Sequence, residues 1–466
     1  MDNARDFRRS RFIIFCYFCD VVYFDNAKII ELIMRKIFIT LLFMILSFTL
    51  FPQKQGYKFS IKLIGVDAPI LYVKGNYGHQ SYIFDSIKAN SQSLYLLQNK
   101  KRIIPDGLYE LVDKKGNSYL EFIVSQNRNF SIKTDTNKWL NYSVEGSDEN
   151  RFFAMIKQME DYNVLDRETV LQYVELSPES LLSKYLKAQY LFTELPDYYI
   201  DNNNEIIDLD IAYSYLIDHF FDHIDFGDAR LLRTPINHNL DLFFTEILSN
   251  QHSDTINREI DKLISKMKGN DEVRRYYLQY LYRLFDTGFP EHAAILVHLY
   301  DTYCPNERCD WLDEHFNRRI KRETLRKRKI LTGQIVPPLE VYTHSQERIS
   351  SEDIKNQYIV LWFWDPDCED CVEKTPKLYE FYQDFHEVYD FEVIAISITE
   401  DYERWNKLIP KFPNWINASF AVGKPNYDFV DYFDLLTTPG IFIIDKEHKI
   451  IARQFPLEEI FTIFEH

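Results

Sequence analysis

The most constraining feature of this sequence of 466 residues is an uninterrupted apolar run, Tyr358-Ile-Val-Leu-Trp-Phe-Trp364. A strand that is apolar at every position is typical of the centre of a sheet whose two faces are both covered. A helical pattern follows, and further strands and a closing helix are expected at residues 392–398, 441–445, 449–452 and 457–464. The order β-α-β-α-β-β-α predicts a C-terminal α/β domain, residues 333–466, with helices on both faces of a mixed sheet.

Residues 56–150 carry a different pattern. Apolar side chains alternate with Lys and Ser in Tyr57-Lys-Phe-Ser-Ile-Lys-Leu63, and Phe130-Ser-Ile-Lys-Thr134 repeats the alternation. A period of two is that of a strand with one buried and one solvated face. Turn signals such as Pro105-Asp106-Gly107 separate the runs. We therefore predict a small antiparallel β-sandwich or barrel.

Residues 151–332 change to a helical period. Ser177-Pro178 is typical of a helix start. A second apolar stripe at helical spacing consists of Ile256, Ile260, Leu263, Ile264 and Met267. The region, which we predict to be all-α, ends in a basic stretch at residues 318–329. We interpret this stretch as a solvated helix end that leads into a linker, rather than as a binding patch.

Cys368-Glu-Asp-Cys371 stands between the apolar run and the helix that comes after it. A helix N-terminus offers free backbone amides and a partial positive charge, which favour a thiolate at Cys368. Cys371 lies about one turn further along, where it can resolve a mixed disulfide. Glu369 and Asp370 oppose the thiolate because they place negative charge between the cysteines. The pattern predicts a thiol–disulfide exchange site, with Cys368 as nucleophile, that is reducing rather than strongly oxidising.

Three separated features resemble one protein family. They are the stretch from Trp362 to Pro376, the segment Thr437-Thr-Pro439-Gly, and the strand expected after it at 441–445. Their order and spacing are similar to those of TlpA/ResA-like thioredoxin-fold proteins, the exported thiol–disulfide oxidoreductases of bacterial envelopes. The resemblance implies a thioredoxin fold for residues 333–466 and a redox-active disulfide between Cys368 and Cys371.

The resemblance also implies a substrate-binding segment. In the family the proline that matches Pro439 is cis and lies against the cysteine pair. The residue before it, here Thr438, offers its backbone to an extended segment of the substrate. Trp364 and Pro366 are implied as further substrate-binding residues. Protein disulfides are therefore the expected substrates, and an unidentified electron donor of the envelope is the expected partner.

The chain departs from the family at two positions. Lys374 stands where members commonly carry a glutamate, and Trp362 stands where many thioredoxins bury a carboxylate that moves protons. Upstream, Gly146-Ser-Asp-Glu-Asn150 resembles part of an uncharacterised β domain, and residues 219–226 with 228–235 resemble an uncharacterised helical domain. Both are often found ahead of thioredoxin modules.

The second close pair of cysteines occurs in Cys304-Pro-Asn-Glu-Arg-Cys309. Because Pro305 breaks the helix, a structural disulfide across this loop is feasible in an exported chain. Electron exchange with Cys368 is one alternative. A zinc site that combines both pairs is another, although a zinc knuckle gives no reason for the strand-to-helix placement of Cys368.

No metal or other cofactor is expected. No histidine follows Cys371, which excludes attachment of a c-type haem. His219 and His223 have helical spacing but lack an identifiable third ligand, so we expect them to form hydrogen bonds rather than to bind metal. The net charge of −17 also argues against nucleic acid as a partner.

The N-terminal part has the layout of an export signal. Met34-Arg35-Lys36 precedes an apolar stretch at residues 37–51, so that 34–53 resembles a signal peptide or an uncleaved membrane anchor. We interpret residues 1–33, which contain Cys16 and Cys19, as an extension that arises from a start codon assigned too early. The expected location is the periplasm or cell envelope, with membrane association through 37–51 if the signal is retained.

These observations predict an exported, multidomain thiol–disulfide oxidoreductase that reduces protein disulfides in the cell envelope. The alternative is an envelope binding or scaffold protein whose thioredoxin module is redox-inert, because a protein can keep a fold after the activity has been lost. A thiol peroxidase is a weaker alternative, since Asp-Pro-Asp-Cys368 lacks the threonine of a peroxidatic loop.

Overall fold

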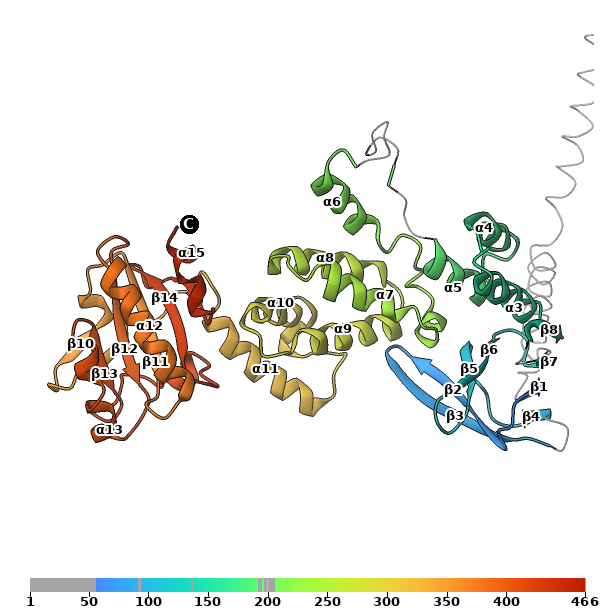
Figure 1. The fold of residues 1–466 in the computed structure, drawn as a ribbon, viewed down its shortest axis with the longest axis horizontal. Helices are drawn as coiled ribbons and strands as arrows, with labels where there is room; N and C mark the ends of the chain where they lie inside the picture. Colours follow the sequence, from blue (N-terminus) through green and yellow to red (C-terminus); the bar gives the residue numbers. More distant parts are fainter. Residues whose placement is uncertain are drawn as a thin grey trace, which may run out of the picture.

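The structure, a computed structural model, describes residues 56–465 apart from 91–93, 136–137, 192–194, 197–198 and 200–205. The predicted signal at 34–53 and the extension with Cys16 and Cys19 lie outside the described residues. A β region, a helical region and a C-terminal α/β domain succeed one another along the long axis of the molecule (Figure 1). Within the described part of the chain, no helix is both long and apolar enough to span a membrane.

The β region consists of two four-stranded sheets, with strand orders β4-β1-β7-β8 and β3-β2-β5-β6. Its strands are β1 (Tyr57–Ile64), β2 (Ile70–Tyr77), β3 (Gln80–Lys88), β4 (Leu94–Asn99), β5 (Gly107–Val112), β6 (Ser118–Val124), β7 (Asn129–Asp135) and β8 (Lys138–Glu145). Apolar side chains of both sheets, including Phe59, Phe122 and Phe130, share one core, as in a sandwich. Strands β1 and β7 pair in parallel, so the prediction of a wholly antiparallel arrangement is wrong. The alternation shows which face is buried but carries no information on the direction of the partner.

The helical region contains helices of very different length. They are α3 (Asp148–Asp161), α4 (Arg167–Leu176), α5 (Leu181–Tyr190), α6 (Leu209–His219), η2 (Ala229–Arg233), α7 (Asn237–Asp241), the π-helix η3 (Leu242–Ile247), α8 (Ser253–Lys266), α9 (Asp271–Phe285), η4 (Pro290–His292), α10 (Ala293–Tyr303), η5 (Pro305–Glu307) and α11 (Glu314–Lys329). Several begin after a side chain that accepts a backbone N–H of the first turn, for example Ser147 before α3 and Asp313 before α11. The start predicted at Ser177 is wrong, because Ser177 ends α4 and Ser180 caps α5.

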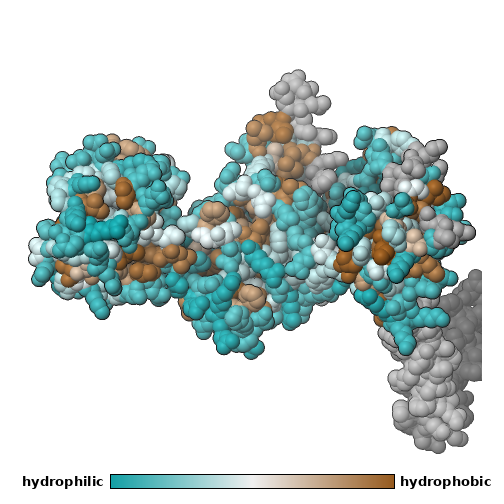
Figure 2. Space-filling model, turned by 60° about the horizontal axis from the view of Figure 1, so that its bottom comes forward, coloured by the Kyte–Doolittle hydropathy of each residue, from teal (hydrophilic) through white to brown (hydrophobic). Residues whose placement is uncertain are grey.

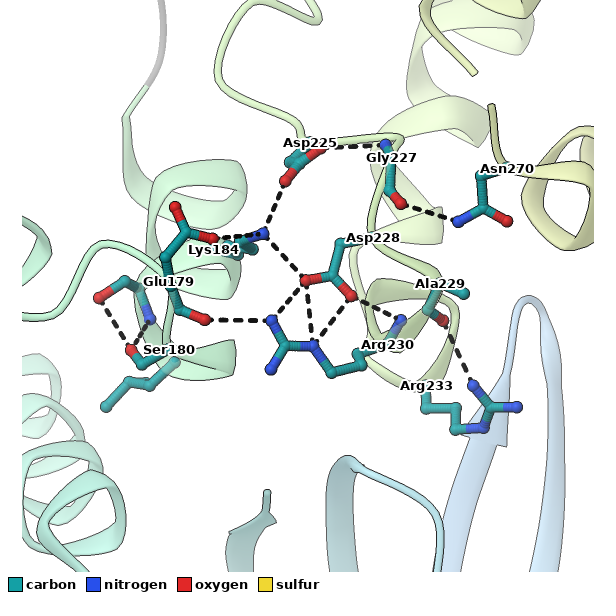
Figure 3. Close-up of polar contacts among 12 residues, drawn as sticks. Glu179, Ser180, Lys184, Asp225, Gly227, Asp228, Ala229, Arg230, Arg233 and Asn270 are labelled. Atoms are coloured by element: carbon teal, nitrogen blue, oxygen red, sulfur yellow. Dashed lines mark hydrogen bonds and ion pairs between the residues drawn. The ribbon is translucent and has the colours of Figure 1, made fainter. Parts of the chain in front are cut away.

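The segment Asp228–Arg233 joins the helices to the β region (Figure 3). Asp228 accepts hydrogen bonds from Arg230 and forms an ion pair with Lys184 of α5 at 3.1 Å. Burial raises the pKa of Asp228, but the hydrogen bonds from Arg230 and Lys184 outweigh burial and lower it to about 2. Next to this cluster, the N–H of Gly78, at the tip of the β2–β3 hairpin, donates to the carbonyl of Leu232. Residues 228–235, which resemble part of a helical domain, therefore take part in the contact between the helical region and the β region.

Helix α6 carries apolar side chains on its surface. Leu209 and Ile211 are 72% and 50% exposed, and Ile207, just before the helix, is 64% exposed. Figure 2 shows hydrophobic surface gathered over this helix, which lies far from the C-terminal domain in both views. This surface is therefore separate from the cysteine pair described below.

The C-terminal domain is built on a five-stranded sheet in the order β13-β12-β11-β14-β15. Its elements are β9 (Glu340–Tyr342), β10 (Arg348–Ser350), η6 (Ser351–Asp353), β11 (Tyr358–Trp364), α12 (Glu369–Phe385), β12 (Phe391–Ser397), α13 (Tyr402–Asn406), η7 (Ile409–Lys411), β13 (Ile416–Ser419), α14 (Phe429–Tyr432), β14 (Gly440–Asp445), β15 (Ile450–Arg453), η8 (Leu457–Glu459) and α15 (Ile460–Glu465). The apolar run at 358–364 forms the central strand, buried on both faces as predicted. One face packs on α12 and α15, and the other packs on α14.

A short connection fixes the helical region to this domain. After α11, the N–H of Gly333 donates to the carbonyl of Ile450 at 2.7 Å, and the N–H of Val336 donates to that of His448 at 2.9 Å. Arg326 of α11 forms an ion pair with Asp434 at 2.7 Å. The prediction that the basic stretch is a solvated helix end is thus wrong for Arg326, because its partner comes from a part of the chain far away in the sequence.

Candidate active site

The cysteine pair lies where β11 passes into α12. The loop after Trp364 turns through a hydrogen bond from the N–H of Cys368 to the carbonyl of Asp365, at 3.1 Å. Cys368 then caps α12, and its Sγ accepts a hydrogen bond from the N–H of Cys371 at 3.2 Å. Both cysteines are free thiols; Cys368 is half-buried, and Cys371 is fully buried. The structure therefore presents one reachable thiol with a second one behind it.

The segment before β14 completes the site. The Thr438–Pro439 peptide bond is cis, and the Cys368 thiol donates to the carbonyl oxygen of Thr438 at 3.1 Å. Gly440, the first residue of β14, pairs with Phe363 of β11. This pairing of neighbouring strands holds the Thr438–Pro439 segment beside the start of α12, so the two motifs meet although 70 residues separate Cys368 from Thr438.

The two thiols differ in their surroundings. Burial raises the pKa of the Cys371 thiol to about 12, and the hydrogen bond with Cys368 adds to the effect. Cys371 therefore stays protonated over the physiological pH range and loses its proton only when it attacks. Cys368, which a substrate can reach, is suited to be the first nucleophile.

Negative charges before and between the cysteines are partly neutralised. Lys374, the residue at the family's glutamate position, forms an ion pair with Asp370 one turn earlier at 3.2 Å. Asp367, just before Cys368, forms an ion pair with Arg404 of α13. The negative charge that the sequence places around Cys368 is thus reduced by two cations, of which Arg404 is remote in sequence.

The remaining residues implied by the resemblance take different places. Thr438 and Pro439 are half-buried, whereas Trp364 and Pro366 are buried. Trp364 is 2% exposed and packs in the core under Cys371, so a substrate at the surface does not reach its ring. Trp362, in the position of the proton-moving carboxylate, donates from Nε1 to Oγ1 of Thr375 at 3.1 Å.

The other cysteine pair is in a different state. Cys304 and Cys309 form a disulfide between α10 and α11, and both are buried. Asn317 of α11 fixes the backbone of Cys309. Its side chain accepts a hydrogen bond from the N–H of Cys309 at 2.7 Å and donates one to the carbonyl of the same residue at 3.0 Å. Among the described residues, no group of three or more His, Cys, Asp or Glu side chains is placed to hold a metal ion.

A family model described as thioredoxin-like matches residues 356–450, which include the cysteine pair and the cis proline. Residues 356–450 form a thioredoxin-like domain. The fold class predicted for each of the three regions is confirmed.

Relatives match this thioredoxin-like domain. A probable nucleoredoxin 1 of Arabidopsis thaliana is 28% identical over 127 residues, which are 27% of this chain and 22% of that protein. The thioredoxin-like protein YneN of Bacillus subtilis (strain 168) is 22% identical over 121 residues, 26% of this chain and 69% of its own. A solved thioredoxin-like protein from Bacteroides caccae aligns with a TM-score of 0.44 and 18% identity, over 59% of this chain and 97% of its own. The chain thus spans less than a quarter of the length of the nucleoredoxin.

One part of the site has no counterpart in the sequence analysis. A cavity of about 260 Å³ opens beside the cis proline, between the thioredoxin-like domain and the helical region. Its wall includes Thr437 and Pro439 from one side and Phe289, Pro290 and Lys327 from the other. No motif or periodicity links the two walls, because they meet through contacts that α11 and the segment at Phe289 and Pro290 make with the domain.

Proposed function

We propose that this protein is an exported thiol–disulfide oxidoreductase that reduces disulfides of polypeptides in the cell envelope. The observation that carries the proposal is the geometry of the pair: a reachable Cys368 at the N-terminus of α12, in contact with Thr438, and a buried Cys371 behind it. A structural disulfide needs neither a reachable thiol nor a neighbouring backbone segment to hold a substrate.

The reaction begins at Cys368. Its thiolate attacks one sulfur of the substrate disulfide, which forms a mixed disulfide and releases the other substrate sulfur as a thiolate. Cys371 then gives up its proton and attacks the Sγ of Cys368. This step forms the Cys368–Cys371 disulfide and releases the second substrate thiolate. The substrate gains two electrons and two protons, and a dithiol donor from outside returns both to the pair.

The cis-proline segment supports the binding part of this proposal. Thr438 and Pro439 lie at the surface next to Cys368, where an extended substrate segment can add to the exposed backbone as a short strand. Such a mode relies on backbone hydrogen bonds and tolerates many sequences. It suits an enzyme that acts on polypeptide disulfides.

The deciding experiment is the reduction potential of Cys368 and Cys371 in the purified full-length chain. Thiols are alkylated across glutathione and dithiothreitol redox buffers, and mass spectrometry of the peptide that contains both cysteines reports the oxidised fraction. A potential between about −120 and −270 mV, the range of exchange-active oxidoreductases, supports the proposal. A potential well below about −300 mV marks a structural disulfide and favours a binding or scaffold protein with an inert module.

A trapping experiment tests the assigned order of attack. Without the resolving thiol, the mixed disulfide on Cys368 persists, so the full-length Cys371→Ala variant is expected to retain disulfide-linked substrate after mixing with oxidised insulin. The Cys368→Ala variant is the matched control and is expected to retain none. Equal trapping by both variants contradicts the roles given to the two cysteines.

Export is the second part of the proposal. Support comes from the signal-like pattern at residues 34–53 and from the Cys304–Cys309 disulfide, since such bonds persist in oxidising compartments. Fractionation of cells that express the native gene, with N-terminal sequencing of the purified protein, tests this part. A cytoplasmic protein that retains residues 1–33 contradicts it.

A further inference from the structure

The cavity beside the cis proline is formed by two regions of the chain. The thioredoxin-like domain supplies Thr437, Pro439 and Arg453, and the helical region supplies Phe289 and Lys327. Thr437 and Pro439 flank Thr438, whose carbonyl oxygen lies 3.1 Å from Cys368 Sγ. The cavity therefore begins within a residue of the point where substrate backbone is expected to bind.

The size of the cavity indicates what it can hold. Its volume of about 260 Å³ lies below the ~300–1,000 Å³ of typical small-molecule pockets, so it fits one long side chain. The rim is apolar, since Phe289 is 59% exposed and Leu436 is 74% exposed. Figure 2 shows hydrophobic surface on the C-terminal domain next to the connection between this domain and the helical region.

The interior carries excess positive charge. Lys327 and Arg453 are the cations of the wall, and Asp434 is its anion. Asp434 already has a partner outside the cavity, because Arg326 forms an ion pair with it at 2.7 Å, whereas Lys327 lies at 3.8 Å. Arg326 also forms an ion pair with Asp431 at 3.4 Å. Within the wall itself two cations thus face one carboxylate, which leaves an attractive field for a second carboxylate.

Arg453 is the best-placed cation for a ligand. Its register opposite Phe442 places it near the start of β14, and it donates one hydrogen bond, to the carbonyl of Pro290 in the helical region. Within the part of the chain that the structure describes, it forms no ion pair with a carboxylate, although a guanidinium has five N–H donors. Burial lowers its pKa to about 10, and the nearby charges of Asp434 and Glu291 oppose this effect.

We propose that this cavity binds an acidic side chain of the substrate polypeptide, through Arg453, and so selects substrate disulfides that have Asp or Glu within a few residues of the attacked cysteine. The inference rests on the proposed reductase function and names its substrate class. An extended segment held along Thr438 advances about 3.3 Å per residue, so a side chain near the attacked cysteine reaches the cavity. Arg453 is a specificity residue here, and the helical region supplies part of the substrate site.

Matched peptides test the proposal with the full-length protein. Each pair of disulfide-linked peptides is identical except for Glu or Gln at one position, scanned over the residues on both sides of the cysteine. With dithiothreitol as donor, kcat/KM is expected to be about tenfold higher for Glu than for Gln at one or two positions, the effect of a charge-assisted hydrogen bond. The preference is expected to lie in KM, because Arg453 does not touch the reacting sulfurs.

Three variants separate recognition from structure. Arg453→Gln is expected to make kcat/KM equal for the Glu and Gln peptides, and Arg453→Lys is expected to retain part of the preference. Lys446→Gln, which removes an equal charge from a side chain that is 59% exposed, is the control and is expected to retain all of it. An Arg453→Gln variant that slows both peptides equally shows a structural role and overturns the proposal, as does a wild type without preference.

Binding gives a readout that does not depend on the redox reaction. Labelled peptides in which serine replaces cysteine are titrated with the protein, and anisotropy reports affinity for the Glu and Gln forms. A preference for Glu that needs Arg453 supports the cavity even if no peptide is reduced, in which case only the reductase function fails. Equal affinities overturn the inference whatever the activity. Competition by free glutarate as strong as that by the Glu peptide also overturns it, since it indicates a small acid as the ligand.

Discussion

The two cysteine pairs that the structure describes have similar spacing, but one pair forms a disulfide and the other consists of free thiols. Cys304 and Cys309 are both buried and joined, in a loop that lies between two helices. Cys368 and Cys371 are reduced, and one of them is open to a substrate. The local backbone differs as well: Pro305 leads into a short turn, whereas Glu369 begins a helix of 17 residues.

The comparison shows that the surroundings of a pair decide its use more than its spacing does. Around the first pair, Asn317 satisfies both backbone groups of Cys309, and both cysteines are buried. Around the second pair, Thr438 approaches Cys368 from another part of the chain and remains at the surface. The proposed exchange activity therefore belongs to the pair that lies beside an accessible backbone segment, and the pair without such a segment is expected to hold the fold together.

The sharpest test of this comparison is the loss of activity when each pair is removed. Cys368→Ser removes the nucleophile, so disulfide reduction is expected to fall by about a thousandfold or more. The double variant Cys304→Ser/Cys309→Ser is expected to keep activity within about twofold, because its sulfurs lie outside the exchange path. Reduction of insulin by dithiothreitol, followed by turbidity, measures both. A large loss in the second variant at full solubility shows electron exchange between the pairs.

Alkylation is expected to separate the two thiols of the reactive pair. In the reduced protein, iodoacetamide is expected to modify Cys368 at least about a hundredfold faster than Cys371, which is buried and protonated. Because the pKa of Cys371 is raised to about 12, its thiolate fraction rises about tenfold per pH unit below that value. Time-resolved mass spectrometry at several pH values checks this. A rate for Cys371 that levels off near neutral pH contradicts the raised pKa.

The disulfide of the helical region is expected to matter for stability. A cross-link between cysteines five residues apart stabilises the fold by about 2 kcal/mol through the entropy of the unfolded chain. Cys304→Ala/Cys309→Ala is therefore expected to lower the free energy of unfolding of the helical region by that amount, measured by urea titration with far-UV circular dichroism. The matched control is wild type with and without oxidation of Cys368 and Cys371. An unchanged transition in the double variant shows that the loop is held by Asn317 and its neighbours.

Much of the fold could be predicted because its local patterns agree with its packing. The apolar run at 358–364 coincides with β11, and the expected strand at 392–398 lies within one residue of β12. The missed elements are short. β13 has four residues and β9 has three, so neither builds a recognisable period, and both form through pairing with neighbours.

The site could be predicted as far as its sequence motifs reach. The strand-to-helix position of Cys368 and Cys371 was visible in the sequence, and the family resemblance placed Thr438 beside them, where the structure has it. Nothing local indicated Arg453 or Phe289, because their meeting depends on how α11 and the linker bring two regions together. The basic stretch shows the same limit: charge density is visible in the sequence, but the pairing of Arg326 with Asp434 is not.

The smallest expected effect concerns the residue that stands in place of a buried carboxylate. Trp362 donates to Thr375 under the reactive pair, and an indole cannot take up a proton, so this position supports structure and does not move protons. Thr375→Val removes the acceptor and is expected to lower the free energy of unfolding by about 1 kcal/mol, while Thr375→Ser keeps it. Insulin reduction should change by less than about twofold in both, with the same pH profile. A pH profile that shifts in Thr375→Val but not in Thr375→Ser shows that this hydroxyl takes part in proton transfer to or from Cys371. The pair would then have a buried proton-transfer group, as many thioredoxins do, although its sequence lacks the carboxylate.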